Sequence, residues 1–499
     1  MSSFLTISSG TFSNFIGGAF VAVLFITAAH IALVGITRKR LVDDKGNQIP
    51  HGPIGLPLVG SFPFLTEWPE LILDRWAKKY GSLYSMWLGN QLFVIISDPH
   101  VKMYVKSELV FAGRGITTTP YNDRWKKHRR LGTMWLSKPA VEKYGHVLDN
   151  EAVVFVKDLY RQGKGGLLPI NIQEHAARFP LNNMLAITFG APPIENVADP
   201  FVGEAVRLAH EFMNTTGPVS NLIDFIPILQ KFPSEMKSRG KKLQSDLIET
   251  YGKMLHEVDG RLKRQENVPD CLAKNLLESR QENDSMTWTW LCFTSSVVQW
   301  FSALIPAYPE IQARAHEELD RVVGRDRLPT VEDEKNMPYI HAIIKEVERC
   351  YNPFWLGTPH VNTQDFTYRG QFIPKDTVVI INTYTMHHDE QRYPDPHRFN
   401  PDRYIDDSTL SSQSANLANP LERDHWMFGA GRRICPGMWL AEREVWLAIA
   451  RMLWAFRLEE VPGEPIDLKS YVGLSGRSPV PFRLKMVPRH ENVAKVLGV

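Results

Sequence analysis

The feature that most constrains the 499-residue sequence is a glycine-rich stretch, Phe-Gly-Ala-Gly-Arg-Arg-Ile-Cys-Pro-Gly, at residues 428–437. Its glycines permit the positive φ angles and the close backbone approach that a tight loop requires. Pro436 suits the first position of a helix, and residues 438–454 continue as a mostly apolar stretch without Gly or Pro. Cys435 therefore lies where a helix is predicted to begin, and there the free N–H groups and the positive dipole end favour a thiolate.

A thiolate surrounded by glycines and followed by a buried helix suits an axial ligand of haem iron. The flat macrocycle must lie against the loop backbone, which explains the lack of side chains. Backbone N–H groups that point at the sulfur would tune its electron donation to the iron. Arg433 is placed to meet a haem propionate. An ordinary buried cysteine at a helix start is the alternative, but the complete Phe-x-x-Gly-x-Arg-x-Cys-x-Gly pattern argues against it.

This pattern resembles the haem-binding loop of the cytochromes P450, the haem-thiolate monooxygenases. Residues 50–488 as a whole are similar to that family, and in style to fungal secondary-metabolism members such as the O-methylsterigmatocystin oxidoreductase group. The resemblance implies haem b with a cysteine thiolate ligand, bound by a mainly α fold with small β-sheets. The residues that carry the motif are Phe428, Gly431, Arg433, Cys435 and Gly437.

Charge and cysteine content exclude several other classes of protein. Lys and Arg number 57 against 55 Asp and Glu, so the formal net charge is +2 and nothing favours nucleic acid as a partner. The four cysteines form no Cys-x-x-Cys pair and no zinc spacing, which fits a reducing compartment. No Gly/Ser-rich linker, repeat or low-complexity tract divides the chain.

The N-terminal region predicts a membrane anchor. Residues 15–36 carry no Lys, Arg, Asp or Glu over a length that spans a bilayer, and basic residues follow at 38–40. The positive-inside rule then places the catalytic domain in the cytosol. A cleaved signal peptide is the alternative, but a basic start and an Ala-x-Ala site are both missing. The predicted organisation is a lumenal segment at 1–14, a transmembrane helix at 15–36, a basic flank and proline-rich hinge at 37–60, and a catalytic domain at 61–499. With the resemblance, this implies a single-pass protein of the endoplasmic reticulum membrane, in contact with membrane lipid.

A basic helix is predicted around Trp125 and Arg129, which lie four residues apart on one helical face. By resemblance to the family's Trp-x-x-x-Arg pair, both contact haem propionates. Read without the resemblance, a basic helix is more often a solvated or partner-docking face. Lys126, Lys127 and Arg130 remain candidates for docking an acidic reductase. His360 follows Pro359 where the family has a basic residue that meets a propionate.

A charge network is predicted behind the haem loop. Glu346 and Arg349 are i,i+3 neighbours on a predicted helix, and Arg403 lies in a segment that resembles the family's Phe-x-Pro-x-Arg motif. The resemblance implies that these three residues form a buried network that locks the core. A charge left unpaired there would cost several kcal/mol. Glu318, on the preceding amphipathic helix predicted at 311–323, is expected to face solvent.

Two segments depart from the family pattern. The central helix normally carries an acid and an alcohol that relay protons to oxygen, but 286–294 lacks the acid and reads about three turns short. Thr294 is the remaining proton-relay candidate. The segment 114–121 is also shorter than in the family. Residues lost through a misassigned exon boundary would explain both gaps; an enzyme with altered oxygen chemistry is the other interpretation.

The sequence thus predicts a monooxygenase that inserts one oxygen atom of O₂ into a small apolar substrate. No Gly-x-Gly-x-x-Gly fingerprint is present, so NADPH is not expected to bind this chain. By resemblance the electrons come from NADPH–cytochrome P450 reductase, with cytochrome b5 as a second candidate donor. Two alternatives remain: a haem-thiolate isomerase or dehydratase that needs no O₂, and a catalytically impaired haem-binding protein.

Overall fold

The computed structural model describes residue 25 and residues 28–30, 32–37, 40–66, 68–95, 122–217, 222–278 and 292–499. The predicted span at 15–36 lies largely outside these residues. The shortened segment at 114–121 and most of 286–294 lie outside them too. Among the described residues, no helix combines the length and the apolar character that crossing a bilayer requires. The chain forms two compact units, and the first consists of residues from 1–101, Leu222–Phe232 and Pro359–Ile380.

The first unit is built on a four-stranded sheet with the strand order β1-β2-β6-β3. β1 and β2 pair antiparallel, with Tyr84 opposite Ile95. β6 then adds parallel to β2, and β3 adds antiparallel to β6. The elements of this unit are α2 Pro69–Tyr80, β1 Tyr84–Leu88, β2 Gln91–Ile95, α8 Leu222–Phe225, β3 His360–Val361, β4 Phe366–Tyr368, β5 Gln371–Ile373 and β6 Val378–Ile380.

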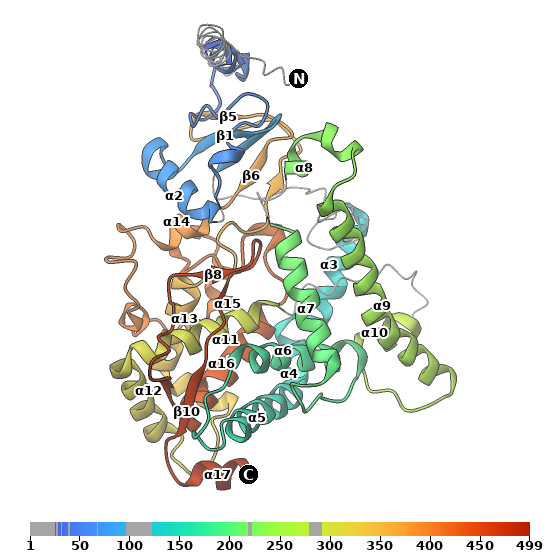
Figure 1. Ribbon diagram of the computed structural model, residues 1–499, viewed down its shortest axis with the longest axis vertical. Coiled ribbons are helices and arrows are strands. Elements are labelled where there is room, and N and C mark those ends of the chain that lie inside the picture. The colour runs from blue at the N-terminus through green and yellow to red at the C-terminus, as the bar shows by residue number, and fades with distance from the viewer. Residues whose placement is uncertain are drawn as a thin grey trace, which may run out of the picture. The chain divides into compact units, whose positions relative to one another are not determined.

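The second unit is mainly helical, as predicted, and strands of its described residues lie in two small two-stranded sheets, β7 with β10 and β8 with β9 (Figure 1). Its helices are α3 Asp123–Leu136, α4 Lys138–Lys143, α5 Gly145–Gln162, α6 Ile172–Phe189, α7 Pro200–Thr215, α9 Glu235–Lys263, α10 Leu272–Glu278, α11 Cys292–Leu304, α12 Pro309–Val322, α13 Pro338–Cys350, α14 Thr383–His387, α15 Ser411–Ser414, α16 Met438–Ala455 and α17 Asn492–Leu497. Its strands are β7 Phe456–Glu460, β8 Tyr471–Val472, β9 Ser478–Pro479 and β10 Leu484–Pro488.

Helix α16 lies at the centre of the second unit and packs against α5, α11, α12 and α13 (Figure 1). Trp446 and Trp454 are among its fully buried side chains, and Trp300 of α11 is buried in the same apolar cluster. Burial of such large apolar surfaces is the main favourable contribution to folding. The apolar stretch that follows the glycine-rich loop is therefore the core of the unit.

Glu318 differs from its predicted position. It lies on α12 as an acidic residue of an amphipathic helix, but it is buried rather than facing solvent. Its two carboxylate oxygens accept hydrogen bonds from the backbone N–H groups of Tyr339 and Ile340, at 3.1 and 3.0 Å. These N–H groups are free because they lie in the first turn of α13. Glu318 thus caps the next helix, which a pattern of hydrophobic periodicity cannot reveal.

The three charged residues predicted to form a network lie together. Arg349 Nε and Nη2 donate to the two oxygens of Glu346 at 2.7 Å each, and both side chains are fully buried within α13. Arg403 Nε donates to Glu346 Oε1 at 3.2 Å. Arg349 Nη1 also donates to the carbonyl of His387 at 2.7 Å, so the network ties α13 to α14. Because these charged groups lie away from water, each of them must be paired with an opposite charge.

We expect Glu346→Ala to lower the free energy of unfolding by about 3–5 kcal/mol, because it leaves the Arg349 guanidinium buried without its carboxylate. Haem occupancy of the purified protein should fall with it. Thermal unfolding and the haem-to-protein ratio measure both effects. Glu249→Ala is the matched control, since Glu249 pairs with Lys253 on the exposed face of α9. A Glu346→Ala protein as stable as this control would contradict a structural role for the network.

Candidate haem site

The glycine-rich stretch forms a closed loop in front of α16. The Cys435 N–H donates to the carbonyl of Phe428 at 2.9 Å, and Gly437 is the N-cap of α16. Gly429 and Gly431 have φ angles of 74° and 62°. Residues that carry a side chain rarely adopt such backbone angles. A Cβ atom added at either glycine would meet nothing within 4 Å. The loop therefore presents bare backbone to open space.

The loop residues fit a flat cofactor with a sulfur ligand. The Cys435 side chain is partly buried on a loop whose glycines leave room for a planar group, and the Gly437 N–H donates to its sulfur. Phe428 is buried and packs with Ile434 and Met438 behind the loop. A soft thiolate sulfur that accepts a backbone N–H hydrogen bond is a suitable ligand for haem iron. Among the described residues, no cluster of three or more His, Cys, Asp or Glu side chains offers a different metal site.

Burial and polar contacts act on the Cys435 thiol in opposite directions. Burial raises the pKa of the Cys435 thiol to about 11, although the Gly437 N–H and the Arg129 charge act in the opposite direction. Desolvation of the anion outweighs the helix N-terminus here. A metal ion is thus required to displace the proton, because thiol ligands bind metals in their deprotonated form.

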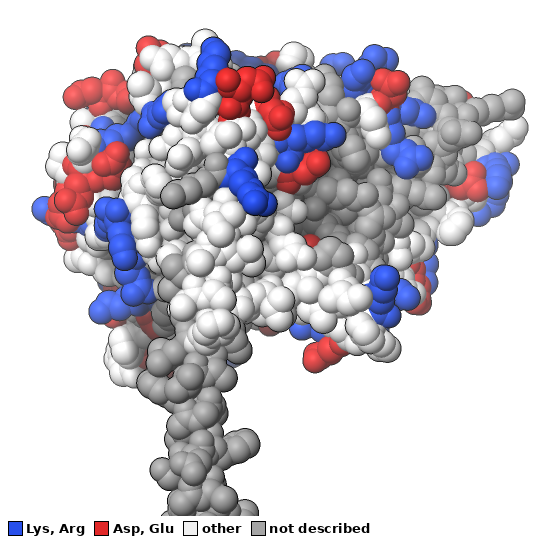
Figure 2. All heavy atoms as spheres, turned by 90° about the horizontal axis from the view of Figure 1, so that it is seen from above, with Lys and Arg blue, Asp and Glu red and all other residues white. Residues whose placement is uncertain are grey.

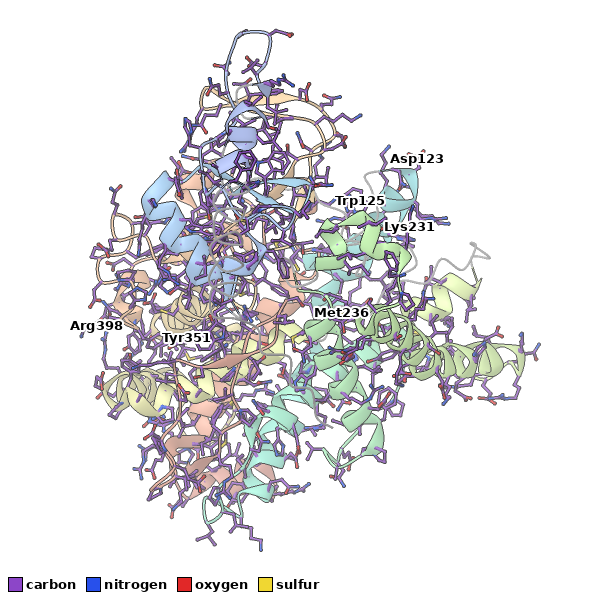
Figure 3. The ribbon with its side chains drawn as sticks, turned by 45° about the horizontal axis from the view of Figure 1, so that its top comes forward. Asp123, Trp125, Lys231, Met236, Tyr351 and Arg398 are labelled. Atoms are coloured by element: carbon purple, nitrogen blue, oxygen red, sulfur yellow. The ribbon has the colours of Figure 1, made fainter. Side chains whose placement is uncertain are left out.

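Helix α3 holds the loop from its other side. Asn122 caps the helix by accepting a hydrogen bond from the Trp125 N–H at 2.9 Å, and Trp125 is buried (Figure 3). The Arg129 side chain reaches the loop directly, since its Nη1 donates to the Ile434 carbonyl at 2.5 Å. The Arg433 guanidinium lies over the Trp125 ring, 4.2 Å from its centroid. This cation–π contact joins the loop to the helix.

The structure therefore brings Trp125, Arg129 and Arg433 together with Cys435. Arg129 uses at least one of its donors on the loop backbone, a contact that spacing along the sequence does not reveal. Their contact with haem propionates stays a prediction. His360 lies at the start of β3 in the first unit, where it is buried. Its role toward a propionate also stays a prediction.

Thr294, the predicted proton-relay residue, is buried in the first turns of α11. Its Oγ1 donates to Glu444 Oε2 on α16 at 2.8 Å. The other oxygen of Glu444 accepts from Asn183 Nδ2 on α6 at 2.9 Å. Neither Glu444 nor Asn183 is found by the sequence motifs. The sequence signal is weak, because Glu444 is only one of four charged residues, with Glu442, Arg443 and Arg451, in the mostly apolar stretch after the loop.

A cavity of about 170 Å³ lies on another face of α11. It is bounded by α6, α7, α11 and β9, all within the second unit. Leu181, Val206 and Met213 give it apolar walls, whereas Ser295 and Gln299 of α11 give it polar ones. Gln173, Glu174 and His210 add further polar groups to the lining, and the cavity is smaller than most small-molecule sites.

A partly buried cysteine on a bare loop, at the start of a buried helix and held by a basic helix, defines a haem-thiolate protein. The Cytochrome P450 family profile matches residues 50–486. The chain is 29% identical to cytochrome P450 monooxygenase polD of Polytolypa hystricis over 94% of this chain and 95% of the relative. It is 30% identical to cytochrome P450 monooxygenase virE of Hypocrea virens, over 92% and 88% of the two chains. A zebra fish cytochrome P450 structure with progesterone has the same fold, with a TM-score of 0.68 at 24% identity over 84% of this chain and 99% of that chain. The chain belongs to the cytochrome P450 family and is a P450 monooxygenase.

We expect Cys435→Ala to abolish the ferrous–CO absorption band that is diagnostic of thiolate ligation, because no other sulfur of the described residues lies on the loop. The measurement is the reduced CO difference spectrum of the purified protein. Cys271→Ala is the control, since Cys271 is a buried thiol of the apolar cluster around α10. It should keep the band. An unchanged band in Cys435→Ala would remove this cysteine as the ligand.

We expect Arg129→Ala to lower haem occupancy, because it removes the hydrogen bond that ties α3 to the Ile434 carbonyl. A hydrogen bond from a charged donor contributes about 1.5–3 kcal/mol. Arg130→Ala on the same helix is the matched control, because Arg130 is exposed. Haem content after denaturant titration distinguishes the two variants. Equal haem loss in both would show that charge, and not the contact with the loop, is responsible.

Proposed function

We propose that this P450 oxidises a small apolar intermediate of fungal secondary metabolism from the endoplasmic reticulum membrane. The observation that carries the oxidation is the bare loop around Cys435, whose glycines face open space. The fungal origin of the relatives polD and virE supports the metabolic setting. The apolar stretch at 15–36 supports the single-pass anchor.

The proposed cofactor is haem b. When bound, it supplies activation of O₂ at an iron whose thiolate ligand favours O–O cleavage. Cys435 would be that ligand, and the Gly437 N–H would limit the charge on its sulfur. Arg433 and Arg129 would neutralise the propionates beside Trp125. Gly429 and Gly431 would leave the face of the macrocycle unobstructed.

The proposed electron donor is NADPH–cytochrome P450 reductase, with cytochrome b5 as a second donor. The basic side chains of α3 support an acidic partner: Lys126 is 53% exposed in its pair with Asp123, and Arg130 is exposed as well. Among the described residues of the face in Figure 2, Lys and Arg side chains are interspersed with Asp and Glu. Docking is therefore expected to depend on local contacts of α3 and on ionic strength.

The proposed substrate is small and mostly apolar, with a few polar groups. The cavity beside α11 supports this class, because its Leu181 and Val206 walls suit an apolar skeleton. Ser295 and Gln299 would then meet oxygen functions of the substrate. Which atom of the substrate is oxidised depends on the substrate itself, and no sequence motif specifies it.

We expect turnover to require both O₂ and the reductase. The protein is expressed in a yeast host with and without NADPH–cytochrome P450 reductase. Each culture is supplied with a fungal culture extract under ¹⁸O₂, and the metabolites of the two cultures are compared. A product that carries one ¹⁸O atom and appears only with the reductase is the expected result. A product that forms without reductase and without ¹⁸O would instead identify an isomerase or dehydratase.

A further inference from the structure

Two buried histidines contact the backbone of the two residues that precede the glycine-rich loop. His387 lies at the end of α14, and its Nε2 accepts a hydrogen bond from the Trp426 N–H at 2.8 Å. His425 lies in the segment before the loop, and its Nδ1 accepts from the Met427 N–H at 3.3 Å. The first histidine is 0% exposed and the second 1%. Two imidazole rings thus hold two consecutive N–H groups at the entry of the loop.

The accepting nitrogen of each ring determines where the ring hydrogen lies, because a nitrogen that accepts from an N–H group carries no hydrogen. Nε2 of His425 therefore carries the hydrogen and donates to Glu348 Oε2 of α13 at 2.9 Å. Nδ1 of His387 likewise donates to the Arg349 carbonyl of α13 at 3.1 Å. In this arrangement each ring is neutral and connects α13 to the backbone before the loop.

The Met427 contact lies next to the hydrogen bond that closes the loop. Phe428 follows Met427 in the chain, and its carbonyl accepts the Cys435 N–H at 2.9 Å. The rings of His425 and Phe428 also lie close together, with centroids 5.9 Å apart. A movement of Met427 away from His425 would therefore displace the carbonyl that holds the backbone of the sulfur-bearing residue.

The two rings differ in how readily they take up a proton. Burial lowers the pKa of His387 well below its ordinary value. Burial also acts against a charge on His425, but the carboxylates of Asp424 and Glu348 outweigh it and raise its pKa. On acidification, His425 therefore becomes charged in a pH range in which His387 stays neutral.

Other charged groups lie on the elements around these rings. Lys345 of α13 is completely buried and pairs with Asp424 at 2.9 Å. Burial raises the pKa of Glu442 on α16 to about 7, so this acid titrates in the same range as His425 and has to be separated from it by experiment. The charged or titratable groups on the surrounding elements are Lys345, Glu348 and Arg349 of α13, His387 of α14, Asp407 and Asp424 of the segment before the loop, and Glu442 of α16.

We propose that His425 is a positioning residue for the Cys435 thiolate, and that a proton on its Nδ1 releases the Met427 N–H from the ring. This inference rests on the haem site of the proposed function. The protonated ring has no acceptor nitrogen, so the contact with Met427 is lost. In exchange, the ring charge strengthens its pairing with Glu348 and Asp424.

The release is confined to one residue of the loop entry. His387 stays neutral and continues to hold the Trp426 N–H. The stability that the raised pKa of His425 contributes is fully present below the ordinary histidine value of about 6.5, and it is lost as the pH rises through the raised value. This group therefore does not favour unfolding at low pH. Loss of thiolate ligation on acidification is expected in a folded protein.

The first test measures the fraction of the ferrous–CO complex of the holoenzyme that has the thiolate band, from about pH 8.5 to about pH 6. In the unmodified protein this fraction should fall severalfold on acidification and recover when the pH is raised again. His425→Asn offers an amide oxygen to the Met427 N–H but takes up no proton, so its fraction should stay high throughout. His425→Ala has no acceptor there, and its fraction should be low at every pH.

Two control variants separate His425 from its titratable neighbours. Glu442→Gln removes the half-buried carboxyl of α16, which contacts Ser412 of α15 instead of the loop entry. His341→Asn changes another buried histidine of α13, whose Nε2 contacts the Thr409 carbonyl at 3.2 Å. Both variants should keep the pH dependence of the unmodified protein. The proposal is wrong if His425→Asn keeps this dependence as well, or if Glu442→Gln loses it.

A second measurement needs no variant and no turnover. Hydrogen exchange of single backbone amides is followed in the unmodified holoenzyme and corrected for the intrinsic effect of pH on exchange. Acidification should lower the protection of Met427 severalfold and leave that of Trp426 unchanged, because His387 stays neutral. Unchanged protection of Met427 would overturn the proposal. A thiolate band that is missing at every pH would instead contradict the proposed function.

Discussion

The burial of α16 is the constraint on which the rest of the structure depends. The helix begins directly after Cys435, and its tryptophans Trp446 and Trp454 are completely enclosed. A helix in this position cannot shift without opening the apolar cluster of the second unit, because interiors are packed as tightly as crystals. The packed core therefore also limits the movement of the Cys435 sulfur. Hydrogen bonds from Arg129 Nη1 to the Ile434 carbonyl and from the Cys435 N–H to the Phe428 carbonyl then fix the loop that precedes α16.

The polar side chains of α16 connect this buried helix to the segments around it. Arg451 is buried and reaches Asp149 and the Pro329 carbonyl, so it connects α16 to neighbouring segments. Glu444 makes similar connections to α6 and α11, but without a compensating charge. A buried ion pair is stable in one protonation state, whereas a lone buried acid lies near its titration point at physiological pH.

Sequence reasoning predicts the parts of this protein that depend on local pattern. The loop at 428–437 follows from glycine placement, whereas the mainly helical fold follows from the resemblance to the cytochromes P450 that this loop carries. The Glu346–Arg349 pair follows from helical spacing. Glu318 and Glu444 do not, because an acidic residue in an amphipathic pattern is assigned to the solvent face. Their environments are created by residues far along the chain: α13 for Glu318, and α6 and α11 for Glu444.

The raised pKa of Cys435 connects folding to cofactor binding. The loop is closed by backbone contacts of the chain itself, and burial raises the pKa of the Cys435 thiol to about 11. Desolvation then disfavours the free anion, and only a metal ion compensates for it.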